Sequence, residues 1–215
     1  MTVGAKICGI NDADAMRAAI DGGATHVGLV FYAPSPRSLD PVAAADLADL
    51  VPDGIARVGL FVDPTDAEIE AVLDKAALDM LQLHGHETPA RVAALKRRTG
   101  LHVMKVIKVA GPEDPAAADA YLEVADWLMF DAKAPADLAG ALPGGNALVF
   151  DWTFLGRREW KLPWMLAGGL DAANVAEAVR RSGAATVDTS SGVEDAPGHK
   201  NTSKIKAFLD AVAAL

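Results

Sequence analysis

Short apolar runs alternate along the whole chain with longer stretches in which alanine and other apolar residues recur at helical spacing among charged ones. Runs rich in Val, Ile, Leu and Phe predict strands, whereas apolar spacings of three and four residues predict amphipathic helices. We expect strands at 4–8, 26–30, 56–62, 79–83, 103–107, 127–130, 164–167 and 185–188. We expect helices near 12–22, 41–50, 66–77, 88–98, 115–123, 147–156, 171–182 and 202–214.

Eight strand–helix units fill the 215 residues, and no Ser/Gly-rich linker or change in composition divides them. The strands are apolar almost throughout, as expected for a parallel sheet with helices on its outer face. The pattern therefore predicts an α/β protein with one domain over residues 1–215, a (β/α)₈ TIM barrel around a parallel eight-stranded sheet. An open doubly wound sheet is the alternative, but no Gly-x-Gly-x-x-Gly follows the first strand.

Composition and charge narrow the class of partner. Hydrophobic residues make up 51% of the chain and the formal net charge is −9, which argues against nucleic acid or an anionic membrane as partner. A single cysteine makes no internal disulfide and suits a reducing compartment. Because there is neither an apolar run of about 18 residues nor a long apolar segment at the N-terminus, we expect a cytoplasmic protein. We expect it to be a monomer or a homodimer that binds a small molecule.

In a barrel of this kind, chemistry collects where strands end and the following loops begin. Gly168 and Gly169 follow the seventh strand, and Ser190, Ser191 and Gly192 follow the eighth. Glycine backbones approach an anion closely, and serine hydroxyls add donors. The two loops together predict a phosphate site, although Gly168-Gly169 alone would also suit a plain turn.

The only cysteine of the chain, Cys8, ends the first strand. Because side chains alternate along a strand, Lys6 and Cys8 share a face. An ammonium beside a thiol favours the thiolate, so Lys6 is expected to lower the pKa of Cys8. From the residues alone, a reactive thiol and a small buried apolar side chain are equal interpretations.

Two aspartates end apolar strands. No helix is expected immediately after Asp131, which weakens a helix-capping role for it. A carboxyl above an apolar core is expected to have a raised pKa and to hold a proton that it can donate. Cys8 and Asp131 are thus a candidate base and acid, on different strands at the same end of the predicted barrel. Asp188, at the end of the eighth strand, is a candidate for orienting a substrate hydroxyl or for organising its own loop.

Two further side chains are candidate substrate ligands. Arg37, in the proline-containing loop after the second strand, suits a bidentate clamp on a carboxylate or phosphate, with a solvated arginine as the alternative. His84 and His86 have the spacing of a possible metal pair, but no convincing third ligand accompanies them. We expect His84 to act as a hydrogen-bonding group, and we predict no metal and no other cofactor.

Taken in order, the motifs of the chain resemble those of the phosphoribosylanthranilate isomerase family over essentially its whole length. They are Lys6-Ile7-Cys8-Gly9, Ser35-Pro36-Arg37, Leu81-Gln82-Leu83-His84-Gly85, Phe130-Asp131, Phe150-Asp151-Trp152, Ala167-Gly168-Gly169-Leu170 and Val187-Asp188-Thr189-Ser190-Ser191-Gly192-Val193-Glu194. There is one departure from the family pattern. The family usually carries Gly-Gly-Ser/Thr-Gly before Phe-Asp-Trp, whereas this chain reads Gly144-Gly145-Asn146-Ala147, which we expect to make this loop less pliant.

The resemblance implies a cofactor-free barrel that converts N-(5-phosphoribosyl)anthranilate into 1-(2-carboxyphenylamino)-1-deoxyribulose 5-phosphate, an Amadori rearrangement in tryptophan biosynthesis. By matching positions, it implies Cys8 as the general base and Asp131 as the general acid, with phosphate held by the loops at Gly169 and Ser190–Gly192. Arg37 is then our candidate for binding the anthranilate carboxylate. Two other interpretations stay open: a non-catalytic barrel that binds a phosphate ligand, and a related aldose–ketose isomerase, in which we would expect a carboxylate in place of Cys8.

Overall fold

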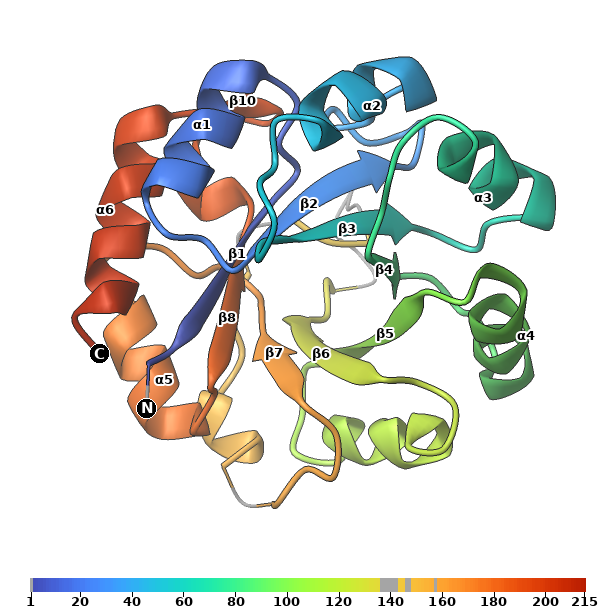
Figure 1. Cartoon of the computed structure of the whole chain (residues 1–215). Coiled ribbons are helices and arrows are strands. Elements are labelled where there is room, and N and C mark those ends of the chain that lie inside the picture. The colour runs from blue at the N-terminus through green and yellow to red at the C-terminus, as the bar shows by residue number, and fades with distance from the viewer. Residues whose placement is uncertain (1, 136–142, 146–147, 157) are drawn as a thin grey trace.

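The fold is a closed parallel barrel of eight strands surrounded by helices (Figure 1), as the alternation predicted. The computed structural model describes residues 2–135, 143–145, 148–156 and 158–215. Its strands run in chain order around the barrel: β1 Gly4–Cys8, β2 His26–Phe31, β3 Ala56–Phe61, β4 Met80–Leu83, β5 His102–Val109, β6 Trp127–Ala132, β7 Trp164–Leu166 and β8 Thr186–Thr189. Closure pairs β1 with β8 and sets Lys6 opposite Asp188.

The α-helices lie where helices were predicted, although the helix expected from residue 171 starts only at Val175. They are α1 Ala13–Asp21, α2 Pro41–Ala48, α3 Asp66–Leu73, α4 Pro89–Thr99, α5 Val175–Ser182 and α6 Thr202–Ala213. Thr65 and Glu68 form a reciprocal capping box at the start of α3, which satisfies backbone donors that the first turn leaves free. Within the described ranges, no helix combines the length and apolar character that crossing a membrane requires.

Two predicted α-helices differ in the structure. The segment expected at 115–123 is a 3₁₀ helix, η1 Asp114–Tyr121, whose cap residue Glu113 makes no side-chain bond to the first turn. The helix expected at 147–156 is wrong: 148–151 are not helical, and only the single turn η2 Trp152–Phe154 follows. Asp151 starts that turn by accepting from the Thr153 N–H; residues 146–147 lie outside the described part.

A short antiparallel hairpin after β8 was not predicted. It follows the 3₁₀ turn η3 Ser191–Val193 and consists of β9 Glu194–Ala196 and β10 His199–Lys200. Gly198 lies between the two strands at φ +82°, a conformation that an L side chain rarely adopts. The hairpin carries Glu194 and Lys200 back toward the barrel mouth, so it becomes part of the site.

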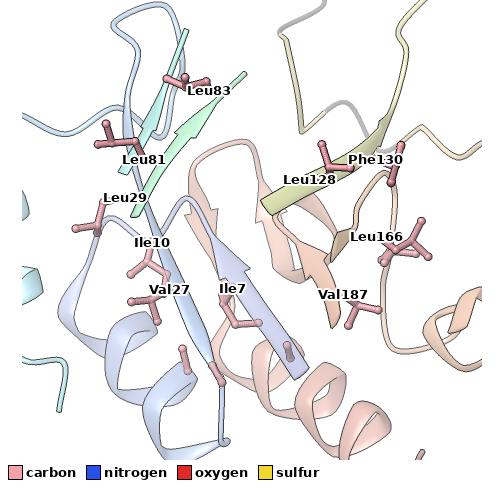
Figure 2. Close-up of a cluster of buried hydrophobic side chains, with 14 of the residues drawn as sticks. Ile7, Ile10, Val27, Leu29, Leu81, Leu83, Leu128, Phe130, Leu166 and Val187 are labelled. Atoms are coloured by element: carbon pink, nitrogen blue, oxygen red, sulfur yellow. The ribbon is translucent and has the colours of Figure 1, made fainter. Parts of the chain in front are cut away.

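Strand alternation divides the apolar side chains into an outer and an inner set. The outer set packs between the barrel and its helices, and Figure 2 shows ten of these residues: Ile7, Ile10, Val27, Leu29, Leu81, Leu83, Leu128, Phe130, Leu166 and Val187. Burial of this layer is the main favourable contribution to folding. The alternate positions of the same strands therefore face the barrel axis.

The inner set fills the barrel interior and is rich in methionine. Met80, Met104, Met129 and Met165, from four adjacent strands, form one buried cluster with Val58, Val106 and Ala167. Unbranched thioether side chains fill irregular space, which suits a narrow barrel floor. Above this floor a smaller cluster of Cys8, Val30 and Leu60 lies on the opposite strands. Polar side chains follow these inner positions toward the ends of the strands.

Candidate active site

A cavity of about 760 Å³, counting the part open to solvent, lies at the end of the barrel where the strands finish. It brings together nine of the eleven residues predicted for the site: Cys8, Arg37, His84, Asp131, Gly168, Gly169, Asp188, Ser190 and Ser191. Lys6 lies just beneath the cavity, fully buried. Gly192 is not part of its lining. The residues at the ends of the predicted strands and in the loops that follow therefore identified most of this surface from the sequence.

Cys8 lies against the cavity, not in the outer helical layer. Its side chain is buried against Val30 and Leu60, and Gly28 on β2 makes room for it, since a Cβ there would be 2.8 Å from Sγ. Burial raises the pKa of Cys8; the Lys6 ammonium lowers it and the Asp188 carboxylate raises it. The expectation of a lowered pKa is therefore wrong: Lys6 acts in the predicted direction, but burial and Asp188 outweigh it.

Lys6 and Asp188 form a buried ion pair across the β1–β8 seam. Lys6 Nζ donates to Asp188 Oδ1 at 2.7 Å, and the Lys6 side chain has no exposed surface. Burial alone would lower the pKa of Lys6, but the attraction of Asp188, helped by Cys8, raises it. Asp188 therefore neutralises Lys6, which explains why this cation affects the thiol less than the sequence suggested. Asp188 also lines the cavity.

Asp131 is held by two donors that reach the same oxygen. His84 Nε2 lies 3.1 Å from Asp131 Oδ2, and Lys108 Nζ from β5 donates to Oδ2 at 2.7 Å. Burial alone would raise the pKa of Asp131, but Lys108 and His84 together hold it well below its ordinary value. The expectation of a raised pKa is therefore wrong, because a cation from the neighbouring strand lies against the carboxylate.

The two histidines after β4 do not form a metal pair. His84 is buried, with Nδ1 3.3 Å from Gln82 Nε2. The side chain of His86 is almost fully exposed and its Nδ1 lies 3.3 Å from Asp63 Oδ2. No group of three or more His, Cys, Asp or Glu side chains suited to a metal is present among the residues that the structure describes. His84 is a hydrogen-bonding residue, as predicted.

Arg37 is buried and paired, not solvated. Its Nε and Nη2 donate to the two carboxylate oxygens of Glu194, both at 2.7 Å. Lys200 Nζ donates to Glu194 Oε1 at 2.7 Å and to Ser190 O at 3.0 Å. The carboxylate fixes the plane of the guanidinium, and Arg37 also borders the cavity. The hairpin thus connects Arg37 with the loop that carries Ser190.

The two predicted phosphate loops lie side by side at one end of the cavity. Gly168 and Gly169 have φ of +93° and +61°, conformations that favour glycine. A Cβ on Gly169 would lie 2.7 Å from Val149 Cγ1 and 2.8 Å from Leu148 O, so a side chain would also collide with the loop after β6. Ser190 and Ser191 line the same cavity as these glycines, so backbone and hydroxyl donors border one space.

Gly192 packs the two loops together. A Cβ on Gly192 would lie 2.0 Å from Leu170 O, closer than any side chain permits. Thr189 Oγ1 donates to the same carbonyl oxygen at 2.6 Å. The closeness of the backbones is a packing reason for glycine at 192, separate from its predicted contact with phosphate.

Comparison with known protein families matches residues 5–211 to the model of N-(5'-phosphoribosyl)anthranilate isomerase. The chain belongs to this family. The isomerase of Paramagnetospirillum magneticum is 59% identical over 211 residues, which are 98% of this chain and 97% of the relative. That of Rhodospirillum centenum is 57% identical over 215 residues and the whole of both chains. The motif resemblance is confirmed.

Solved structures of isomerases from this family have the same fold. The phosphoribosylanthranilate isomerase of Thermotoga maritima is 32% identical and superimposes with a TM-score of 0.87, covering 99% of this chain and all of the other. Another, in complex with reduced 1-(o-carboxyphenylamino)-1-deoxyribulose 5-phosphate, is 30% identical with a TM-score of 0.82 over 99% of this chain and all of the other. The barrel prediction is confirmed.

Four site residues of this isomerase-family chain were missed by sequence reasoning. They are Gly28, Lys108, Glu194 and Lys200. Strand alternation could have placed Lys108 of β5 on the inner face of the barrel, because Met104 and Val106 share that face. Its contact with Asp131 is known only from the closed barrel. Glu194 belongs to one of the family motifs, but its partner Arg37 is 157 positions away, and no local pattern links them.

Proposed function

We propose that this member of the isomerase family carries out its reaction, the Amadori rearrangement of N-(5'-phosphoribosyl)anthranilate, with Cys8 as base and Asp131 as acid. The observation that supports this assignment most directly is that one thiol and one carboxyl, from β1 and β6, border a single cavity. The reaction needs one proton given and one taken, and each such step contributes roughly 10²–10⁴-fold in rate. The chain's own side chains can supply both.

The chemistry has two proton-transfer steps, followed by a tautomerisation. Asp131 gives its proton to the ring oxygen of the aminosugar, the bond from that oxygen to C1′ breaks, and an iminium forms at C1′. The Cys8 thiolate then removes the proton from C2′, whose electrons form the enolamine, and this tautomerises to the ketone. At the end Cys8 has gained a proton and Asp131 has lost one. The net atoms of the substrate are unchanged, as an isomerisation requires.

The directions of the two pKa shifts describe the resting protein. A raised pKa leaves Cys8 as a thiol, and a lowered pKa leaves Asp131 as a carboxylate. That is the protonation state at the end of turnover, whereas the reactive state has the proton on Asp131 and a thiolate at Cys8. Both states hold the same number of protons. Each cycle therefore needs one proton to pass from the thiol side to the carboxylate side.

The two ends of the substrate have separate partners in this proposal. The glycine and serine loops at Gly169 and Ser190 hold the phosphate, and Arg37 binds the anthranilate carboxylate through the edge that Glu194 leaves free. Asp188 is the candidate partner of a ribose hydroxyl. Holding both ends orients C2′ between acid and base, and such orientation removes a large entropic part of the barrier.

The fluorescence of phosphoribosylanthranilate, followed without added metal, tests the assignment. We expect Cys8→Ala and Asp131→Asn each to lose roughly 10²–10⁴-fold in kcat, while calorimetry shows nearly unchanged affinity for the reduced product 1-(o-carboxyphenylamino)-1-deoxyribulose 5-phosphate. Asp126→Asn is the matched control, since Asp126 pairs with Lys96 before β6 starts and away from the cavity. Full activity in either purified site variant would remove its assigned role.

The cellular setting is part of the same proposal: a cytoplasmic enzyme of tryptophan biosynthesis whose partner is this small molecule. Its assembly is proposed as monomer or homodimer. One related structure is described as monomers generated from the dimeric isomerase of Thermotoga maritima. Sedimentation of the purified chain across a concentration series distinguishes the two assemblies.

A further inference from the structure

The amide of Gln82 lies buried beneath the acid end of the cavity. Gln82 stands two residues before His84, so both side chains face the barrel interior. Gln82 Nε2 lies 3.3 Å from His84 Nδ1 and 3.4 Å from Met129 Sδ. Gln82 Oε1 has no hydrogen-bond partner among the residues that the structure describes, although it is fully buried. A buried acceptor without a partner costs free energy and calls for an explanation.

The ring of His84 connects this amide to Asp131. Its Nδ1 faces Gln82, and its Nε2 faces Asp131 Oδ2 and Lys108 Nζ. A neutral imidazole has one N–H donor and one acceptor nitrogen, and the partner of one nitrogen determines the role of the other. Burial, together with the nearby Lys108 ammonium, lowers the pKa of His84, which keeps the ring neutral. The group opposite Nδ1 therefore decides what Nε2 can offer Asp131.

Gln82 can present either of two groups to Nδ1. With the Gln82 Nε2 group against Nδ1, Nδ1 accepts and the His84 Nε2–H donates to the Asp131 carboxylate. The Lys108 ammonium beside His84 Nε2 donates to that carboxylate and not to the ring. A half-turn of the amide places Oε1 against Nδ1, which must then carry the proton. His84 Nε2 now has a lone pair, and it can accept a hydrogen bond from Asp131 in its protonated form. The two amide orientations thus match the ionised and the protonated acid.

We propose that Gln82 is a positioning residue that sets the tautomer of His84 and thereby favours one of the two hydrogen-bonding states of Asp131. This inference rests on the proposed role of Asp131 as the acid. The two states differ by one proton on Asp131, and the tautomer change itself moves a proton between the two nitrogens of His84. In each turnover Asp131 gives this extra proton to the ring oxygen, and Cys8 takes a different proton from C2′, so one proton must later return to Asp131. The partnerless Oε1 acquires a donor only in the protonated state.

The tautomer of His84 can be read directly by long-range ¹H–¹⁵N correlation spectra of the full chain labelled with ¹⁵N-histidine. The chain has five histidines, and His84→Asn identifies the signal of His84 by its loss. We expect the wild-type ring to be neutral with its proton on Nε2. Gln82→Glu, whose carboxylate only accepts, should move the proton to Nδ1. Gln82→Met, of similar shape but without a polar group, should give a mixture of both tautomers.

Kinetics then show whether the tautomer matters for the reaction. We expect both Gln82 variants to lower kcat roughly tenfold, the size of one lost hydrogen bond, with KM for phosphoribosylanthranilate changed less than about twofold. Met129→Leu is the matched control, because Met129 Sδ is only a weak acceptor for the same amide, and similar volumes are tolerated in cores. It should leave both the tautomer and kcat near wild type, and circular dichroism establishes that every variant is folded.

The outcomes separate this inference from the proposed function. If His84 keeps the wild-type tautomer in both Gln82 variants, or if the tautomer changes while kcat does not, the role of Gln82 is overturned. In either case a large loss of activity in Asp131→Asn still supports the acid. Full activity of Asp131→Asn would instead remove the acid itself, whatever the spectra of the Gln82 variants show.

Discussion

The ammonium of Lys108 on β5 lies 2.7 Å from Asp131 Oδ2 on the neighbouring strand β6. Together with His84, this pair lowers the pKa of the proposed acid, although burial alone would raise it. Lys108 therefore determines how much of the free protein has the proton that the reaction needs. The charge of one inward-facing lysine, rather than the apolar floor beneath it, sets the acid's resting state.

Removal of Lys108 should change the acidic limb of the pH profile. The folded-state pKa of Asp131 is depressed, so the carboxylate persists as pH falls and becomes protonated only well below the ordinary value of about 3.9. In Lys108→Met the pKa of Asp131 rises, and the acidic limb of kcat/KM should move to higher pH. Lys96→Met, the same change at a pair remote from the cavity, should leave it in place. An acidic limb at the same pH in Lys108→Met and wild type would contradict this prediction.

Replacement of Lys6 should make the thiol harder to ionise. Lys6 lowers the pKa of Cys8, whereas Asp188 raises it, so Lys6→Met should move the midpoint of iodoacetamide alkylation to higher pH. In Lys6→Met with Asp188→Asn, both effects are gone and the increase should be smaller. Because Cys8 is the sole cysteine, the reaction reports one group.

The same two variants test stability in urea. Lys6→Met leaves a buried carboxylate unpaired, which typically costs about 3–5 kcal/mol of unfolding free energy, while the double variant should recover most of that loss.

For the influence of Lys6 on the thiol, the order of the alkylation midpoints is the decisive result. Equal midpoints in the wild type, Lys6→Met and the double variant would show that Lys6 has no influence on the thiol.

Arg37→Lys should weaken substrate binding more than turnover. A lysine keeps the charge but loses the planar fork that Glu194 holds in place. Since a hydrogen bond to a charged group is worth about 1.5–3 kcal/mol, KM should rise roughly 10- to 100-fold, with a smaller change in kcat. Steady-state kinetics measure both. Arg57→Lys, which breaks a similar bidentate pair with Asp79 at the start of β3, serves as control, and an unchanged KM in Arg37→Lys would exclude the carboxylate role.

Gly169→Ala should reduce affinity for inorganic phosphate as a competitive inhibitor. The added Cβ meets Leu148 and Val149 and occupies a backbone with φ +61°, so the loop must move. Gly183→Ala is matched in conformation, with φ +74° at the end of α5, but its Cβ meets nothing within 4 Å. Gly183→Ala should lose roughly 1–2 kcal/mol of stability from the left-handed backbone alone, Gly169→Ala should lose more because its Cβ also collides, and only Gly169→Ala should bind phosphate more weakly. Equal inhibition constants in the two variants would count against the loop after β7 as part of the phosphate site.

The pattern of apolar residues predicted the barrel because each strand must bury both of its faces, so the strands are apolar almost throughout. The same alternation correctly predicted that Cys8 and Asp131 lie at the mouth of the barrel. It also predicted a helix at 147–156, where Asp151 starts only a single turn. A short segment of sequence shows which residue types are present, but it does not show the capping geometry that ends a helix after one turn.

The electrostatics of the site could not be predicted in the same way. Arg37 meets Glu194 across 157 positions of sequence and Lys6 meets Asp188 across 182. Such pairs exist only once the barrel has closed, so an inference from neighbours along one strand omits the partners that outweigh them. For Cys8 the omitted partner is Asp188, whose effect adds to that of burial. For Asp131 the omitted partners are Lys108 and His84. The directions predicted for the two pKa values were therefore both wrong, although the residues themselves were correctly located.

The contact of Gly192 with Leu170 has a consequence for recombination among related isomerases. Because the two backbones touch with no space for a methyl group between them, the segments after β7 and β8 have shapes that depend on each other. A chimera whose crossover point falls between those strands would combine segments from two proteins whose backbones do not match at this contact. Exchange of both segments as one cassette preserves the match, so it should yield working hybrids far more often.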